Sequence, residues 1–141
     1  MTDITITPEL RNYLAADPTL STLAPGGVWE DPAPSNQSAP VVVLLYETAE
    51  DDTCGGGSRV TRFYYAAKVV GTAAMIATVR QAALRLDALL HFGPIAQEHL
   101  PGYNVLTSKR LEPIAYPDPE PSTGVRYMHR GGHYQIDVEA A

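Results

Sequence analysis

The chain has 141 residues, of which 45% are hydrophobic and 18% are charged, a balance that supports one packed domain and argues against a disordered chain. Its formal net charge is −6, which argues against a protein that holds nucleic acid by neutralising phosphates with clustered lysine and arginine. Cys54 is the only cysteine, so an intrachain disulfide and a cysteine-rich zinc site are both excluded.

The beginning of the chain carries no targeting signal. Its first seven residues, Met-Thr-Asp-Ile-Thr-Ile-Thr, have neither the basic start nor the apolar stretch of a secretion signal. No apolar run approaches the roughly 18 residues of a membrane span. We therefore expect a protein that is made in the cytoplasm and has no membrane partner.

The first predicted element is a helix that begins at Thr7-Pro8-Glu9. A threonine is a suitable capping residue, proline suits the first helical position, and glutamate favours the positive end of the helix dipole. Apolar residues follow at helical spacing, namely Ile6, Leu10 and Leu14. Asp17-Pro18 ends this helix, because a residue before proline avoids the α region.

The next segments predict a strand between two loops. A proline-rich surface loop is predicted over residues 30–40. Residues 41–46 form a short, continuous, β-branched run that is typical of a strand covered on both faces. Residues 47–58 are acidic and glycine-rich, which predicts a long hairpin loop.

A returning strand and the clearest helix follow. Residues 59–70 alternate between apolar and polar side chains, and the predicted packed face contains Phe63, Tyr65, Ala67 and Val69. Residues 73–91 have apolar side chains at helical spacing, and Gly93-Pro94 is expected to end this helix with the glycine at the cap position.

The last third of the chain predicts two more strands, over residues 103–114 and 125–139, joined by a loop. That loop, residues 115–124, is acidic and stiffened by prolines at alternate positions. In the final strand Tyr134, Ile136 and Val138 are expected to face inward. Before Gly131-Gly132 the apolar residues, Val125 and Tyr127, stand at odd-numbered positions, whereas after it they stand at even-numbered ones. This change of phase predicts a bulge or bend at the glycine pair.

Together these elements predict one α+β domain over residues 1–141. The expected architecture is a mixed, mostly antiparallel sheet of about four strands, with two helices packed on one face. The long loops are expected at residues 30–40, 47–58 and 115–124.

The segment Cys54-Gly55-Gly56-Gly57-Ser58 has two interpretations. A nucleophile on a phosphate-binding loop is one of them, but the lysine and hydroxyl residue of a P-loop are missing, and the segment precedes a strand instead of a helix. Only Arg59 is near enough in sequence to lower the thiol pKa. The pattern therefore favours the tip of a hairpin.

Two other clusters contain residue types that could bind a metal ion or take part in acid–base chemistry. His129 and His133 are four residues apart, a spacing that permits a metal pair, but a glycine pair lies between them and no third ligand is close in sequence. Glu50, Asp51 and Asp52 could serve acid–base chemistry or hold a divalent cation. Their position in a predicted loop favours a solvated, charged tip.

Enzyme motifs are missing from the sequence. There is no Gly-x-Ser-x-Gly, no His-Glu-x-x-His, no dinucleotide fingerprint and no plausible catalytic triad. We predict a protein that is not an enzyme and that has no catalytic residues, cofactor or metal. A small cytoplasmic binding or enzymatic domain that uses Cys54 or the His129/His133 pair is the alternative from a different class.

The order of elements carries a family resemblance. A capped helix leads to Val28-Trp29, then Pro40 precedes the strand at 41–46, and an aromatic strand at 62–70 precedes the long Ala/Leu helix. The last strand ends Tyr-Gln-Ile-Asp-Val at 134–138. This pattern resembles the tail-terminator and tail-completion (minor tail) proteins of long-tailed bacteriophages.

The resemblance implies a structural virion protein that forms a ring, usually of six copies, at the head-proximal end of the tail tube. Such a ring ends tube polymerisation and joins the tail to the neck. The implied partners are further copies of the chain, the major tail tube protein, a neck or head-completion protein, and genomic DNA that passes through the lumen without specific binding. The implied location is the tail–neck junction of a virion assembled in the host cytoplasm. Another head–tail connector, a stopper or adaptor, is the close alternative.

Within that interpretation, two groups of side chains in the predicted hairpin have expected roles. We predict that Glu50, Asp51 and Asp52 face the lumen or the tube, because an acidic surface repels DNA phosphates and lets the genome slide. Arg59 and Arg62, at the base of the hairpin, are predicted to pair with acids of an adjacent subunit. A role in surface solubility is the alternative for both arginines.

The loop at residues 115–124 is the third predicted contact. We expect it to touch a neighbouring ring through Tyr116, Asp118 and Glu120.

Overall fold

The structure is a computed structural model that describes residues 5–30, 39–53, 59–96, 100–118 and 124–140. The described part contains three α-helices, α1 (Thr7–Ala15), α2 (Pro18–Leu23) and α3 (Ile76–Leu90), and two short 3₁₀ helices, η1 (Ala73–Met75) and η2 (Pro94–Ala96). Its strands are β1 (Val28–Glu30), β2 (Val41–Thr53), β3 (Arg59–Thr72), β4 (Tyr103–Pro117) and β5 (Tyr127–Ala140).

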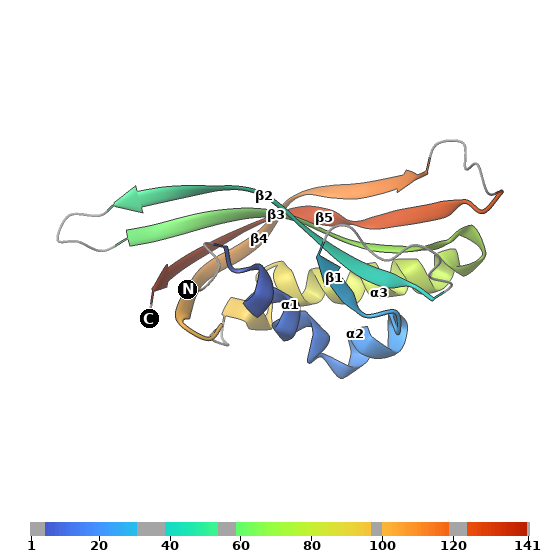
Figure 1. The fold of residues 1–141 in the computed structure, drawn as a ribbon, viewed down its shortest axis with the longest axis horizontal. Coiled ribbons are helices and arrows are strands. Elements are labelled where there is room, and N and C mark those ends of the chain that lie inside the picture. The colour runs from blue at the N-terminus through green and yellow to red at the C-terminus, as the bar shows by residue number, and fades with distance from the viewer. Residues whose placement is uncertain (1–4, 31–38, 54–58, 97–99, 119–123, 141) are drawn as a thin grey trace.

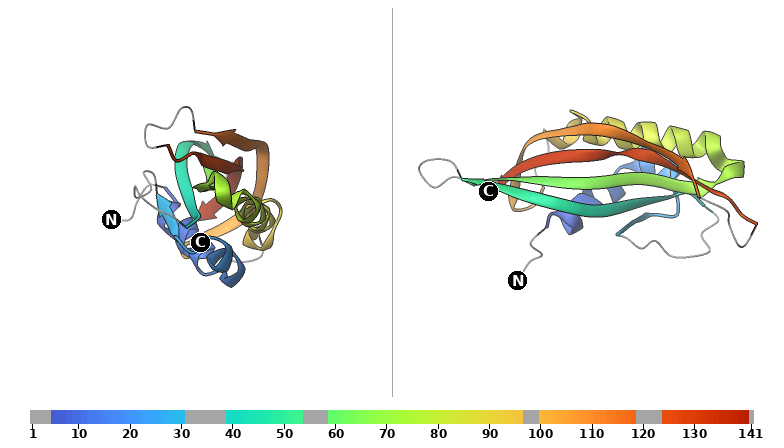
Figure 2. Two further views of the ribbon diagram at one scale, coloured as in Figure 1. Left: turned by 90° about the vertical axis from the view of Figure 1, so that its right-hand side faces the viewer. Right: turned by 90° about the horizontal axis from the view of Figure 1, so that it is seen from above.

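The strands form one sheet in the order β1-β2-β3-β5-β4. β1 runs parallel to β2, and every other pair is antiparallel. The helices lie on one face, and the sheet curves over α3 (Figures 1 and 2). This confirms the predicted α+β class, with a fifth strand because the short Val28–Glu30 segment pairs with residues 42–44.

The core lies between the sheet and the helices. The predicted inward residues of β3 and β5 are all buried: Phe63, Tyr65, Ala67, Val69, Tyr134, Ile136 and Val138. They pack in one cluster with side chains of α1 and α3 that include Leu10, Leu14, Val79 and Leu86. At Gly71 a Cβ atom would lie 2.6 Å from Cγ2 of Val79, so the glycine lets α3 begin close to the sheet.

The hairpin between β2 and β3 differs from the prediction. Residues 47–53 belong to β2, which pairs with β3 as far as Thr53 opposite Arg59, so only residues 54–58 lie outside the described part. A register shift between Tyr46 and Thr48 introduces a bulge. Val41–Leu44 are buried, as expected for a strand covered on both faces, whereas Leu45 and Tyr46 are exposed. Residues 47–53 can be largely polar because, among those of them that the structure describes, only Ala49 packs against the core.

The predicted loops at 30–40 and 115–124 are only partly described. Residues 31–38 and 119–123 lie outside the described part. Residues 115–117 were predicted as loop but continue β4, opposite residues 128–130 of β5. Pro113 and Pro117 are tolerated there because β4 is an edge strand of the described sheet.

The predicted irregularity at the glycine pair is also corrected. The β3–β5 register continues without a shift through Gly131 and Gly132, and the register shifts lie in β4 instead, beside Leu106 and Leu111. At Gly131 a Cβ atom would lie 2.1 Å from the carbonyl oxygen of Ala67. The glycine therefore serves the close approach of β3 and not a bulge.

Two helix ends differ from their predicted caps. Thr7 is the first residue of α1 and not its cap; its hydroxyl lies 2.6 Å from that of Tyr65, which joins α1 to β3. Gly93 was predicted as the cap of the long helix, but α3 ends at Leu90, and Phe92 is the residue that adopts a left-handed conformation there, with φ of 52°.

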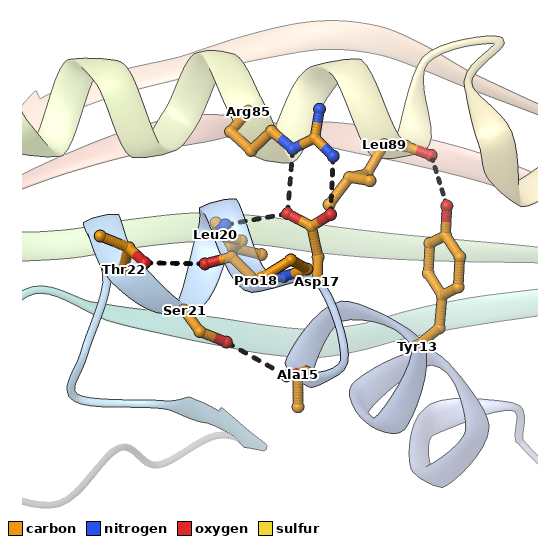
Figure 3. Close-up of polar contacts among 9 residues, drawn as sticks. All are labelled: Tyr13, Ala15, Asp17, Pro18, Leu20, Ser21, Thr22, Arg85 and Leu89. Carbon is orange, nitrogen blue, oxygen red and sulfur yellow. Dashed lines mark hydrogen bonds and ion pairs between the residues drawn. The ribbon is translucent and has the colours of Figure 1, made fainter.

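Asp17 connects the N-terminal helices to α3 (Figure 3). Its carboxylate accepts the backbone N–H of Leu20 at 2.8 Å, which caps α2, and binds Arg85 of α3 through two hydrogen bonds of 2.6 and 2.9 Å. The hydrogen bond with Arg85 holds the pKa of Asp17 below its usual value. A residue that the sequence assigns to a helix stop thus also makes a polar contact that holds α3 against the N-terminal helices.

Candidate assembly surfaces

The outer part of the β2–β3 hairpin forms the first surface, which we call the β2–β3 arm: residues 45–53 of β2 and 59–62 of β3. The hairpin extends past the helices (Figure 1). β1 pairs with β2 only as far as Leu44, so within the described residues the outer edge of β2 has no partner strand beyond that point. An unpaired strand edge is a surface on which another chain can add.

The three predicted lumen acids lie in succession on this arm. Glu50, Asp51 and Asp52 are all exposed. Asp51 accepts a hydrogen bond from the hydroxyl of Thr61 at 2.8 Å, and Asp52 forms an ion pair with Arg62 at 3.2 Å. Glu50 has no ion pair with any described residue. Since side chains alternate along a strand, Glu50 and Asp52 share one face and Asp51 lies on the other.

The two predicted inter-subunit arginines differ from each other. The guanidinium of Arg62 is 3.2 Å from Asp52 and 3.7 Å from Asp137 of β5, so its charge is already matched within the chain. Arg59 is exposed at the start of β3 and has no ion pair within the described part. Of this pair, Arg59 is therefore the one whose charge is available to a partner.

The residues predicted to touch a neighbouring ring lie near the end of β4, on the sheet face opposite the helices. The ring of Tyr116 stacks on His129 at 4.4 Å between centroids, and its hydroxyl accepts a hydrogen bond from Lys68 at 2.8 Å. Asp118 contacts Nε2 of His129 at 2.5 Å. Burial lowers the pKa of His129 against the opposing effect of Asp118. Glu120 lies outside the described residues.

His133 has partners different from those of His129. Its Nδ1 lies 2.9 Å from Glu47 of β2, and its Nε2 lies 3.8 Å from Glu112 of β4. Among the described residues, no three side chains of the metal-binding types converge on one point. Cys54 lies outside the described part of the chain.

A groove between α3 and β4 forms the second surface, which we call the α3–β4 groove. It has a volume of about 380 Å³, and its walls include Arg80, Leu84 and Asp87 of α3, Arg110 and Ile114 of β4, and Arg130 of β5. Leu84 is 72% exposed. No pattern in the sequence predicts this groove, although Arg80 and Leu84 both lie off the apolar stripe of the long helix.

The charges in the groove are only partly matched inside the chain. Arg110 forms an ion pair with Asp87 at 2.7 Å, and the other carboxylate oxygen of Asp87 accepts a hydrogen bond from Tyr134. Arg130 donates to the backbone carbonyl of His129 and has no carboxylate partner in the described chain. Arg80 likewise pairs with no described acid. The groove therefore carries a surplus of positive charge beside an exposed leucine.

Comparison with known proteins finds similarity at the level of structure. No protein family matches the sequence, and no curated protein matches it. A solved chain from the virion of a native gene transfer agent particle matches with a TM-score of 0.60 and 19% identity, over 98% of this chain and 100% of that chain. At this identity the match establishes a shared fold. None of the described helices combines the length and hydrophobicity needed to cross a bilayer.

Proposed function

We propose that the chain is a structural protein of a phage-like virion, and more specifically a tail terminator. The observation that carries the proposal is the match of fold over nearly the whole chain to a component of a gene transfer agent virion. The order of elements, which resembles that of tail-terminator proteins, supports the same assignment independently of the match. In this role the chain forms a ring of six copies at the tail–neck junction, in contact with the tail tube and a neck protein.

Two physical features favour a ring. The β2–β3 arm and the α3–β4 groove are different surfaces, and contact between unlike surfaces of identical chains generates a closed ring when the rotation closes. The net charge of −6 favours a lumen through which DNA passes without being held.

The roles of individual residues stay predictions within this proposal. Glu50, Asp51 and Asp52 are assigned to the lumen, and Tyr116 and Asp118 to a neighbouring ring. Replacing Asp51 and Asp52 together by asparagine tests the lumen assignment, because unchanged tail length and infectivity would contradict it.

The ring is tested by native mass spectrometry of the purified chain. Six copies of the 15.2 kDa chain give about 91 kDa. A chain that stays monomeric at high concentration contradicts the proposal.

The terminator role needs a separate test with a polymerising tail tube protein. A terminator added to that reaction shortens the tubes and is seen at one end by electron microscopy. A stopper or adaptor leaves tube length unchanged, so this outcome would favour the alternative connector role.

A further inference from the structure

The β2–β3 arm and the α3–β4 groove carry opposite charge. The arm has four carboxylates and two arginines: Glu47, Glu50, Asp51, Asp52, Arg59 and Arg62. The groove has three arginines, Arg80, Arg110 and Arg130, and one carboxylate, Asp87. Charge complementarity of this kind guides association and selects partners.

Apart from Arg59 on the arm, the charged groups that have no internal partner are also complementary. Within the described residues, Glu50 on the arm has no cation, and Arg80 and Arg130 in the groove have no carboxylate. Each surface has exposed apolar side chains as well. Leu84 is 72% exposed in the groove, and Leu45 and Tyr46, at the base of the arm, are 38% and 39% exposed. An interface that pairs these surfaces would cover apolar area and match the charges together.

The two surfaces lie toward opposite ends of the molecule. The arm is at one end of the sheet (Figure 1), whereas the groove lies between residues 80–87 in the middle of α3 and residues 110–115 of β4. The arm therefore cannot enter the groove of its own chain. The arm of a second copy, however, can reach the groove and has the charge that complements it.

We propose that the β2–β3 arm of one copy lies in the α3–β4 groove of the next, with Glu50 facing Arg80 and Arg130 and with Leu84 covered. The proposal rests on the ring proposed above and names the contact that closes it. The contact is head-to-tail, so every copy uses both surfaces. This contact replaces the lumen position assigned to Glu50 above, because Glu50 then faces a neighbouring copy.

Charge reversal tests the contact. We expect Glu50→Arg and Arg80→Glu each to raise the concentration needed for assembly by roughly tenfold or more, since each places like charges opposite one another. Mixing the two variants should restore assembly. The arginine on the arm of the first variant then meets the glutamate in the groove of the second, while the arm of the second meets the unaltered groove of the first.

Two matched variants control for the change in net charge. Glu30→Arg and Arg11→Glu reverse exposed charges outside both surfaces, and each should assemble like the unmodified chain. Thermal unfolding of all four variants checks that each one folds. The readout is the distribution of masses across a concentration series.

The outcomes separate the contact from the ring. If the unmodified chain never assembles, the ring and this contact are both wrong. If the unmodified chain forms rings and the variants Glu50→Arg and Arg80→Glu each form them equally well, the contact is wrong and the ring stands. If both variants fail alone and also fail when mixed, the arm does not meet the groove and the contact is again wrong.

Discussion

The two faces of the sheet are held together by different interactions. On the face covered by helices, Phe63, Ile136 and their neighbours are buried in one apolar cluster with α1 and α3. On the opposite face, side chains of neighbouring strands form polar contacts, such as Arg62 with Asp137 and His133 with Glu47. The first face determines stability, because burial of apolar area outweighs partly exposed ion pairs. Substitution of a charged residue on the second face should therefore cost the fold little stability.

The largest difference between buried and exposed positions is expected within α3. Leu86→Ala should lower the free energy of unfolding by about 3 kcal/mol, because it leaves a cavity at a fully buried position. Leu84→Ala is the matched control on the same helix, and at its 72% exposed position it should cost less than about 0.5 kcal/mol. Urea unfolding at a concentration where the chain is monomeric measures both. Equal losses would mean that the helix packs by a different face.

A smaller loss is expected from the polar contact on the helix side. Asp17→Asn removes the charge that binds Arg85 and weakens the cap of α2, so we expect a loss of about 2 kcal/mol at neutral pH. The pKa of Asp17 is lowered in the folded chain, so this stabilisation is present above its ordinary value of 3.8 and disappears as the pH falls through the folded value. Unfolding at pH 7 and pH 2.5 should show the variant and the unmodified chain converging in acid. A constant gap between them would assign the loss to packing and not to charge.

The smallest effect is expected on the open face, at His129. Burial lowers its pKa in the folded chain below the ordinary value of 6.5, and its Nδ1 is buried with no hydrogen-bond partner in the described part. The unfolded chain therefore binds more protons as the pH falls below 6.5, and the folded chain loses stability. His129→Asn should make unfolding free energy less dependent on pH between 7.5 and 5. Parallel pH curves for the two chains would contradict this.

The elements that could be predicted from sequence are those with a regular pattern of burial. Alternation along β3 and β5 identified their buried faces because each strand has one face in the core, and apolar spacing located α3. The three-residue β1 is too short to carry a pattern. The outer half of β2 lacks such a pattern, because residues 47–53 are mostly polar or acidic and precede a glycine-rich segment, which is typical of a loop.

The contacts that could not be predicted join residues far apart in the chain. Asp17 and Arg85 are 68 positions apart, so only the folded chain brings the helix stop to the long helix. The α3–β4 groove likewise combines Arg80, Arg110 and Arg130 from three elements. The acids of the arm could be identified from the sequence. The ion pairs that Arg62 forms with Asp52 and Asp137 could not, because they join different strands.

The close packing at Gly71 has a consequence for how this sequence can vary. A Cβ atom at position 71 would lie 2.6 Å from Cγ2 of Val79, and a β-branched side chain has little rotamer freedom, so a larger residue at position 71 requires a change at position 79. Related chains with alanine at position 71 should carry a smaller residue at position 79. Positions 71 and 79 should therefore covary, as a pair that sets how closely the long helix approaches the sheet.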